Sequence, residues 1–175
     1  MQAGTQQDVF EVGDLAQMVS PKSGLPVSTY GVNGGPYWIV GVHPAVDPVH
    51  RSLHPQLVDF LYQTEYRPGI TRFPGFNFRK IAGRKAIIFQ KGDLVHLRRR
   101  MPWEDEGMFK ALLDLHGSGL FKVEDAEWTR TTFDQDAPAH PQWVTLDRHD
   151  SQGKWHKSSP GIIKISGFYL TKLPI

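Results

Sequence analysis

Glycine and proline interrupt this chain along its whole length, with 17 glycines and 13 prolines spread over 175 residues. Glycine tolerates positive φ and proline lacks a backbone N–H, so both residues favour turns and end regular elements. This spacing argues against a helical bundle and predicts many short elements joined by turns. We therefore expect a β-rich α+β fold, with short antiparallel strands in a small barrel-like sheet.

The clearest turn is Asn33-Gly34-Gly35, which separates the β-rich runs 26–32 and 37–42. An Asn-Gly pair can adopt positive φ at both central positions of a tight turn. The sequence therefore predicts a β-hairpin across these two runs.

Two short helices are expected, at about 55–65 and 102–116. Pro55 and Pro102 suit the first turn of a helix, and Gly117 is a natural C-terminal stop. Apolar residues follow each proline at a spacing that can form one buried face.

Two shorter features are expected beside these helices. Asp47-Pro48 can cap a short helical turn. The prolines and glycines of residues 66–84 predict a long ordered loop.

A chain of this length is predicted to form a single compact domain, residues 1–175. It contains a weak internal echo: Gly13-Asp14-Leu15 is followed by the aromatic run 35–40, and Gly92-Asp93-Leu94 by the run 119–123. A Gly-Asp-Leu strand start with a later glycine-led aromatic strand resembles small SH3-like barrels. The resemblance implies a duplicated barrel, with halves near 8–65 and 85–150, and it assigns no functional residue.

Charge is segregated along the chain. Residues 66–103 contain ten lysines and arginines with one acid, whereas residues 104–136 contain nine acids with three bases. Such separation bears on partners and association rather than on fold. We expect the two signs to stay separated on the folded surface.

The basic segment supplies the candidate binding residues, and aromatic residues are interleaved with them. Cations bind phosphates and aromatic rings stack on bases, so nucleic acid is one candidate partner, with a protein surface and a merely solvated face as the alternatives. The candidates are Arg72, Arg79, Lys80, Arg84, Lys85, Arg98, Arg99 and Arg100.

His43, His50 and His54 lie close together in the sequence, with Asp47 between them. These residue types can bind a metal ion, but the neighbouring prolines interrupt any regular ligand geometry. Turn and surface histidines are the favoured interpretation, and no metal site or cofactor is predicted.

The chain has no cysteine and no recognisable nucleotide-binding or nucleophile motif, so no catalytic residue is assigned. The N-terminus lacks the basic and apolar regions of a secretory signal. The longest uncharged run, residues 23–46, contains five glycines and three prolines and is not expected to span a membrane.

The leading hypothesis is a non-enzymatic structural or adaptor subunit of a large assembly. Its partners would be other protein subunits, including copies of itself, and the most specific form is a bacteriophage virion component of the neck, tail or baseplate. It would act in a cytoplasmic assembly or a virion. The alternatives are a small nucleic-acid-binding protein that uses residues 66–103 and an enzyme without a local motif.

Overall fold

The computed structural model describes residues 8–27, 35–63, 68–107, 109–110, 119–129, 140–149, 154–156 and 163–174. The chain, for which the sequence predicts one compact domain, divides into two compact units. Unit 1 comprises residues 1–86 and 129–141, and unit 2 comprises residues 87–128 and 142–175. Each unit is built on an antiparallel sheet, so the predicted β-rich fold is confirmed.

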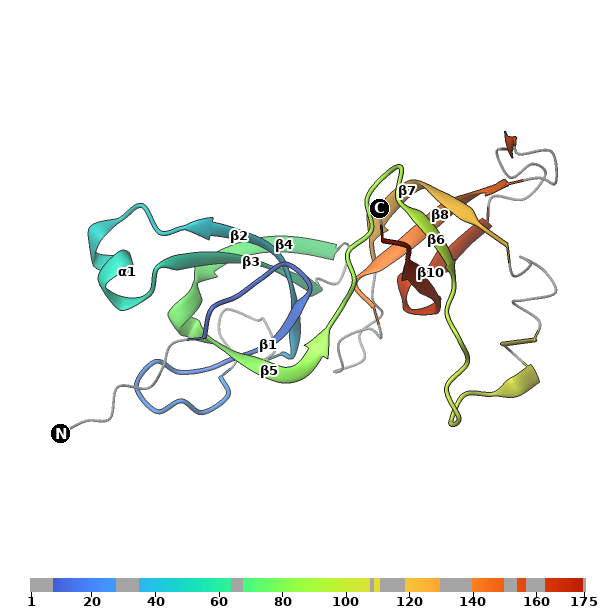
Figure 1. Cartoon of the computed structure of the whole chain (residues 1–175). Helices are drawn as coiled ribbons and strands as arrows, with labels where there is room; N and C mark the ends of the chain where they lie inside the picture. Colours follow the sequence, from blue (N-terminus) through green and yellow to red (C-terminus); the bar gives the residue numbers. More distant parts are fainter. Residues whose placement is uncertain are drawn as a thin grey trace. The chain divides into compact units, whose positions relative to one another are not determined.

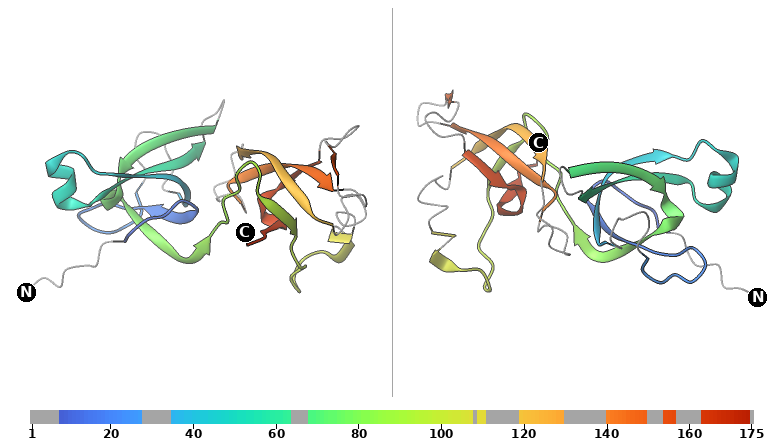
Figure 2. Two further views of the ribbon diagram at one scale, coloured as in Figure 1. Left: turned by 45° about the horizontal axis from the view of Figure 1, so that its top comes forward. Right: turned by 180° about the vertical axis from the view of Figure 1, so that it is seen from behind.

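Unit 1 is a five-stranded sheet in the order β4-β3-β2-β1-β5 (Figure 1). The sheet is curved rather than flat, as the views of Figure 2 also show. A 3₁₀ turn, η1 (Gly75–Asn77), precedes the last strand, and a short helix, α1 (Pro48–Leu53), joins β2 to β3. The strands are β1 (Asp14–Met18), β2 (Tyr37–Pro44), β3 (Gln56–Gln63), β4 (Pro68–Pro74) and β5 (Phe78–Lys85).

Unit 2 has the same strand order, β10-β8-β7-β6-β11, and the two-residue strand β9 (Trp155–His156) also pairs with β8. Here too a 3₁₀ turn, η2 (Gly167–Tyr169), precedes the last strand. The other strands are β6 (Leu94–Leu97), β7 (Phe121–Trp128), β8 (Gln142–His149), β10 (Ile163–Ser166) and β11 (Leu170–Lys172).

Strand register aligns the two units residue by residue. On the first strand of unit 1, Ala16 lies opposite Tyr37 and Lys80, and in unit 2 Val95 lies opposite Phe121 and Lys172. The aligned positions form both hydrophobic cores. The corresponding core pairs are Phe10 and Phe89, Ala16 and Val95, Met18 and Leu97, Tyr37 and Phe121, Ile39 and Val123, Val58 and Val144, Phe60 and Leu146, and Phe78 and Leu170.

A glutamine side chain ties down the segment before the first strand in both units. The Gln56 amide accepts from the Phe10 N–H at 2.8 Å and donates to the Phe10 carbonyl at 3.0 Å. Gln142 makes the same pair of bonds to Phe89, at 2.8 and 3.1 Å. Backbone groups that leave water must be paired, so this clamp stabilises both cores at one equivalent place.

The Gly-Asp-Leu segments occupy equivalent places at the start of β1 and β6. Gly13 and Gly92 have φ of 94° and 93°, values that glycine adopts without steric strain. The buried Asp14 forms an ion pair with Lys80 at 2.7 Å, and Asp93 forms one with Lys172 at 2.8 Å. Each aspartate therefore joins the first strand of its unit to the last.

The helix expected at 55–65 is wrong, because residues 56–63 form β3. Val58 and Phe60 are fully buried on one face of the sheet. Apolar residues at 57, 58, 60 and 61 fit a helical face as well as a strand that is apolar on both sides. Pairing with β2 and β4 on either side decides the outcome.

The second expected helix, 102–116, is not confirmed. The structure has helical backbone at 106–107 and 109–110 only, and residues 108 and 111–118 lie outside the described part. By contrast, the short turn expected at Asp47-Pro48 is confirmed as α1, with the Asp47 carboxylate accepting from the N–H groups of Val49 and His50.

The long loop expected at 66–84 is also wrong, because residues 68–85 form β4, η1 and β5. Pro68 and Pro74 are tolerated because β4 is an edge strand, where a missing N–H costs no ladder bond. Neither sheet closes into a barrel within the described residues, since the two edge strands of each remain unpaired with one another.

Residues 28–34, with the expected hairpin turn, lie outside the described part, although β2 begins where the second run was expected. None of the described helices is long and apolar enough to cross a membrane.

Candidate binding site

The basic candidate residues are divided between the two units. Arg72 lies on β4, and Arg79, Lys80, Arg84 and Lys85 lie on β5, the opposite edge of unit 1. Arg98, Arg99 and Arg100 follow β6 in unit 2. Cations on edge strands also discourage pairing with the edges of other sheets, so a purely structural role is available to them.

Half of the eight candidates form ion pairs with acids of their own unit. Within unit 1, Arg72 pairs with Asp59 at 2.6 Å, Lys80 with Asp14 at 2.7 Å, and Lys85 with Glu11. In unit 2, Arg98 pairs with Glu104. The expected separation of charge is therefore not kept at these four positions. Acids from before residue 66 meet the basic residues of β4 and β5, and Glu104 pairs with Arg98 six residues before it.

Asp59 is the centre of a polar cluster on β2, β3 and β4. Its carboxylate accepts from Arg72 and contacts His43 Nε2 at 2.7 Å. Hydrogen bonds from Arg72, and secondly from His43, hold the pKa of Asp59 below its usual range. Arg72 Nη2 lies 2.8 Å from His43 Nε2, so the three side chains restrain one another.

The three clustered histidines go to different environments. His43 joins the Asp59 cluster, His50 lies on the exposed α1, and His54 is buried. Across the described segments no group of three or more His, Asp or Glu side chains could hold a metal ion.

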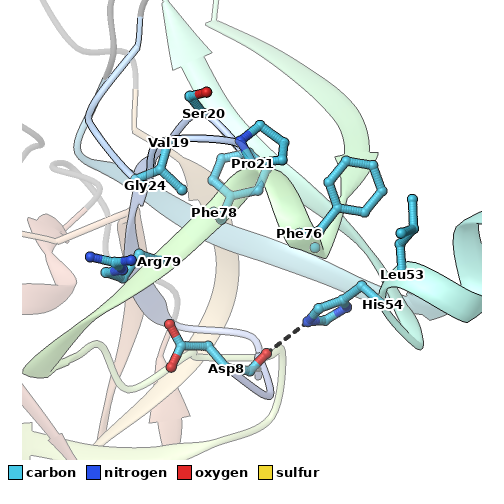
Figure 3. A pocket seen from close by; sticks show the side chains of 11 residues that line it. Asp8, Val19, Ser20, Pro21, Gly24, Leu53, His54, Phe76, Phe78 and Arg79 are labelled. Carbon is cyan, nitrogen blue, oxygen red and sulfur yellow. Dashed lines mark hydrogen bonds between the residues drawn. The ribbon is translucent and has the colours of Figure 1, made fainter. Parts of the chain in front are cut away.

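A cavity of about 320 Å³ opens in unit 1 between the β1–β2 loop, the end of α1 and η1. Its apolar lining includes Pro21, Leu53 and Phe76, and its charged side chains are Asp8 and Arg79 (Figure 3). In the view of Figure 3, Arg79 and Asp8 lie on one side and Phe76 and Leu53 on the other. An apolar wall that faces a few polar groups is typical of ligand sites.

His54 fixes one wall of this cavity. Its Nδ1 accepts from the Gln56 N–H at 3.0 Å, so its Nε2 carries the proton and donates to the Asp8 carbonyl at 2.9 Å. The ring packs against Phe10, with centroids 5.9 Å apart, and directly over Gly75. With both nitrogens occupied, His54 is a structural clamp and not a free ligand or base.

No family model, curated protein or solved structure matches this chain. The cavity, the ion pairs and the repeated architecture are therefore the features from which a function can be inferred.

Arg79 is the one predicted binding residue that lines the cavity. Its guanidinium lies against Gly24, where a Cβ would come within 3.0 Å of Nη2 and where φ is +65°. Arg79 forms no ion pair with any described residue. The exposed arginine is thus held at the mouth of the cavity with its charge available.

Reasoning from the sequence did not bring the other lining residues together in one site, among them Asp8, Ser20, His54 and Phe76. They come from four segments far apart in the chain, and no local pattern connects them. One signal was readable, the repeat of Gly-Phe-x-x-x-Lys at 75–80 and 167–172, which places a 3₁₀ turn before each last strand.

Unit 2 carries a second charged cluster, in which Glu104 accepts two hydrogen bonds from Arg98 and one from the Met101 N–H. The bonds from Arg98, followed by that from Met101, hold the pKa of Glu104 at about 2, against its ordinary value of 4.5. The folded state therefore favours the ionised carboxylate.

We expect Glu104 to stabilise unit 2 fully above about pH 4.5, and this contribution should be lost as the pH falls towards 2. In Glu104→Gln, the stability of unit 2 should change less than in the wild type between about pH 6 and pH 3. Urea unfolding at both pH values measures this difference. The exposed Glu106→Gln should keep the wild-type dependence, and an equal flattening in both variants would contradict the assignment.

Proposed function

We propose that this protein is a non-enzymatic adaptor subunit of a multi-subunit assembly, in which the two units bind other protein subunits. The observation that carries the proposal is the repeat of one sheet architecture, with matching cores, glutamine clamps and Asp–Lys pairs, within a single chain. Two binding units in one chain turn the second binding event into an intramolecular one.

Exposed apolar side chains beside the cavity support a protein partner. Val46, Val49 and Leu53 around α1 are 76%, 66% and 48% exposed, and the helix buries none of its residues. Apolar residues that gather on a surface are typical of interaction sites. The cavity that Leu53 lines lies next to them.

The most specific form of the proposal is a bacteriophage virion component of the neck, tail or baseplate. It rests on the glycine- and proline-rich sequence and on the charge segregated along it. Nucleic-acid binding by residues 66–103 stays the rival prediction, although four of the eight candidate cations in this segment form ion pairs with acids of their own unit.

Native mass spectrometry of the protein isolated from its source tests the adaptor function. We expect complexes of fixed stoichiometry, either with co-purifying proteins or with further copies of this chain. A monomer that carries no partner at any salt concentration would count against the proposal.

A further inference from the structure

The cavity of unit 1 has an equivalent place in unit 2. The residue after the first strand bonds to the 3₁₀ turn in both units: Val19 N–H donates to the Asn77 carbonyl at 2.8 Å, and Arg98 N–H donates to the Tyr169 carbonyl at 2.9 Å. Arg98 therefore takes the place of Val19. By the same alignment, Phe168 of η2 takes the place of Phe76 of η1.

In unit 2 this place is filled by the chain itself. The Arg98 guanidinium lies 4.3 Å from the centroid of the Phe168 ring and donates to the Phe168 carbonyl at 2.7 Å. Glu104 pairs with Arg98, and the two side chains are only 8% and 12% exposed. The segment 98–104 thus brings a carboxylate to a cation that is stacked on the phenylalanine of the 3₁₀ turn.

In unit 1 the cation is supplied from another strand, and no carboxylate of the described residues forms an ion pair with it. Arg79 of β5 lines the cavity, whereas its equivalent in unit 2 is Thr171, since Gln17 faces Arg79 and His96 faces Thr171. Asp8 is the other charged residue of the lining, and its Oδ2 accepts from the backbone N–H of Lys80 at 2.8 Å.

We propose that the cavity of unit 1 binds an acidic peptide segment of a partner protein, whose carboxylate pairs with Arg79 while an adjacent apolar side chain packs on Phe76 and Pro21. This assignment rests on the proposed adaptor function, and it specifies the kind of partner segment that unit 1 binds. Charge-assisted bonds to arginine give such recognition its strength and its geometry. The apolar wall supplies the remaining contact area.

The test uses the full chain and a capped heptapeptide with the sequence of residues 101–107, Met-Pro-Trp-Glu-Asp-Glu-Gly. Calorimetric titration should show saturable binding, with a Kd of about 10–100 μM. Arg79→Gln should weaken binding at least about tenfold. Asp8→Asn keeps an acceptor for the Lys80 N–H and should tighten binding by about two- to threefold, because a like charge is removed.

Arg84→Gln is the matched control. Arg84 is also an exposed arginine of β5 without an ion pair in the described structure, but it does not line the cavity. Its variant should bind the peptide within about twofold of the wild type, as expected for a charge outside the site. Equal losses in Arg79→Gln and Arg84→Gln would overturn the proposal.

Two further arms identify the ligand class. A peptide with glutamine and asparagine in place of its acids should not bind, and a single-stranded oligonucleotide should not compete. Binding of the oligonucleotide but not of the acidic peptide would overturn the proposal. If native complexes persist in Arg79→Gln while no acidic peptide binds, the adaptor function stands and this site assignment falls.

Discussion

Replacing Gly75 with alanine should destabilise unit 1 by about 2–4 kcal/mol, because overpacking at a buried site is added to the loss of a buried hydrogen bond. A Cβ at this position would lie 2.4 Å from Cε1 and Nδ1 of the His54 ring. His54 is 2% exposed, and its ring could move away only into the cavity that it lines, with loss of its bonds to Asp8 and Gln56.

Urea unfolding and amide exchange resolved along the sequence measure the effect. Amide exchange should become faster in β1, β3 and β5. The affinity for the acidic heptapeptide should also fall, because His54 is displaced from the cavity wall.

Gly119→Ala is the control for the general effect of adding a methyl group. No atom lies within 4 Å of a Cβ built at Gly119, so stability should change by less than about 0.5 kcal/mol. If Gly75→Ala behaved like Gly119→Ala, the ring of His54 would not be fixed in the way the hydrogen bonds indicate.

Local chemistry was predictable from the sequence where a few adjacent residues decide the structure. The cap at Asp47 needs only a carboxylate followed by two backbone N–H groups, and it forms as expected. The segment 56–63 was not predictable in this way, because its apolar residues suit two faces of a strand as well as one face of a helix. Its neighbours in the sheet, 37–44 and 68–74, make the choice.

Pairing of charge was hidden from the sequence for a similar reason. Asp14 meets Lys80 only after the distant strands β1 and β5 come together, and Asp59 meets Arg72 through the register of the consecutive strands β3 and β4. A segregated sequence therefore became a surface with neutralised pairs. Among the candidates without such an acid in the described residues, Arg79 stands out because it also lines the cavity, which no count along the chain could reveal.

The internal echo was visible as two Gly-Asp-Leu segments, yet its extent required the register of the strands. The fuller repeat, Phe-x-x-Gly-Asp-Leu at 10–15 and 89–94, is short enough to arise by chance in a sequence. The structural evidence that the repeat is real is the pair of glutamines, Gln56 and Gln142, which make the same two hydrogen bonds to Phe10 and Phe89. Glutamine alone carries no sequence signal of this role.

Replacing Asp14 with alanine should destabilise unit 1 by about 2–4 kcal/mol, and Asp93→Ala should do the same in unit 2. Asp14 is fully buried and accepts the Glu11 N–H at 2.8 Å, while Asp93 is 7% exposed and accepts the Gln90 N–H at 2.7 Å. Removing either carboxylate leaves an N–H and a lysine without their partner. The lysines are about one-third exposed, which limits the cost because water can solvate them.

Sequence-resolved amide exchange in urea distinguishes the two variants. Asp14→Ala should speed amide exchange in β1 and β5, and Asp93→Ala should speed it in β6 and β11. Asp14→Asn should lose about half as much stability as Asp14→Ala, because its amide oxygen still accepts the Glu11 N–H. The exposed Asp125→Ala should stay within about 0.5 kcal/mol of the wild type. A large loss of stability in one of the two alanine variants, with none in the other, would contradict this prediction. The two Asp–Lys pairs would then share a geometry but not a stabilising role.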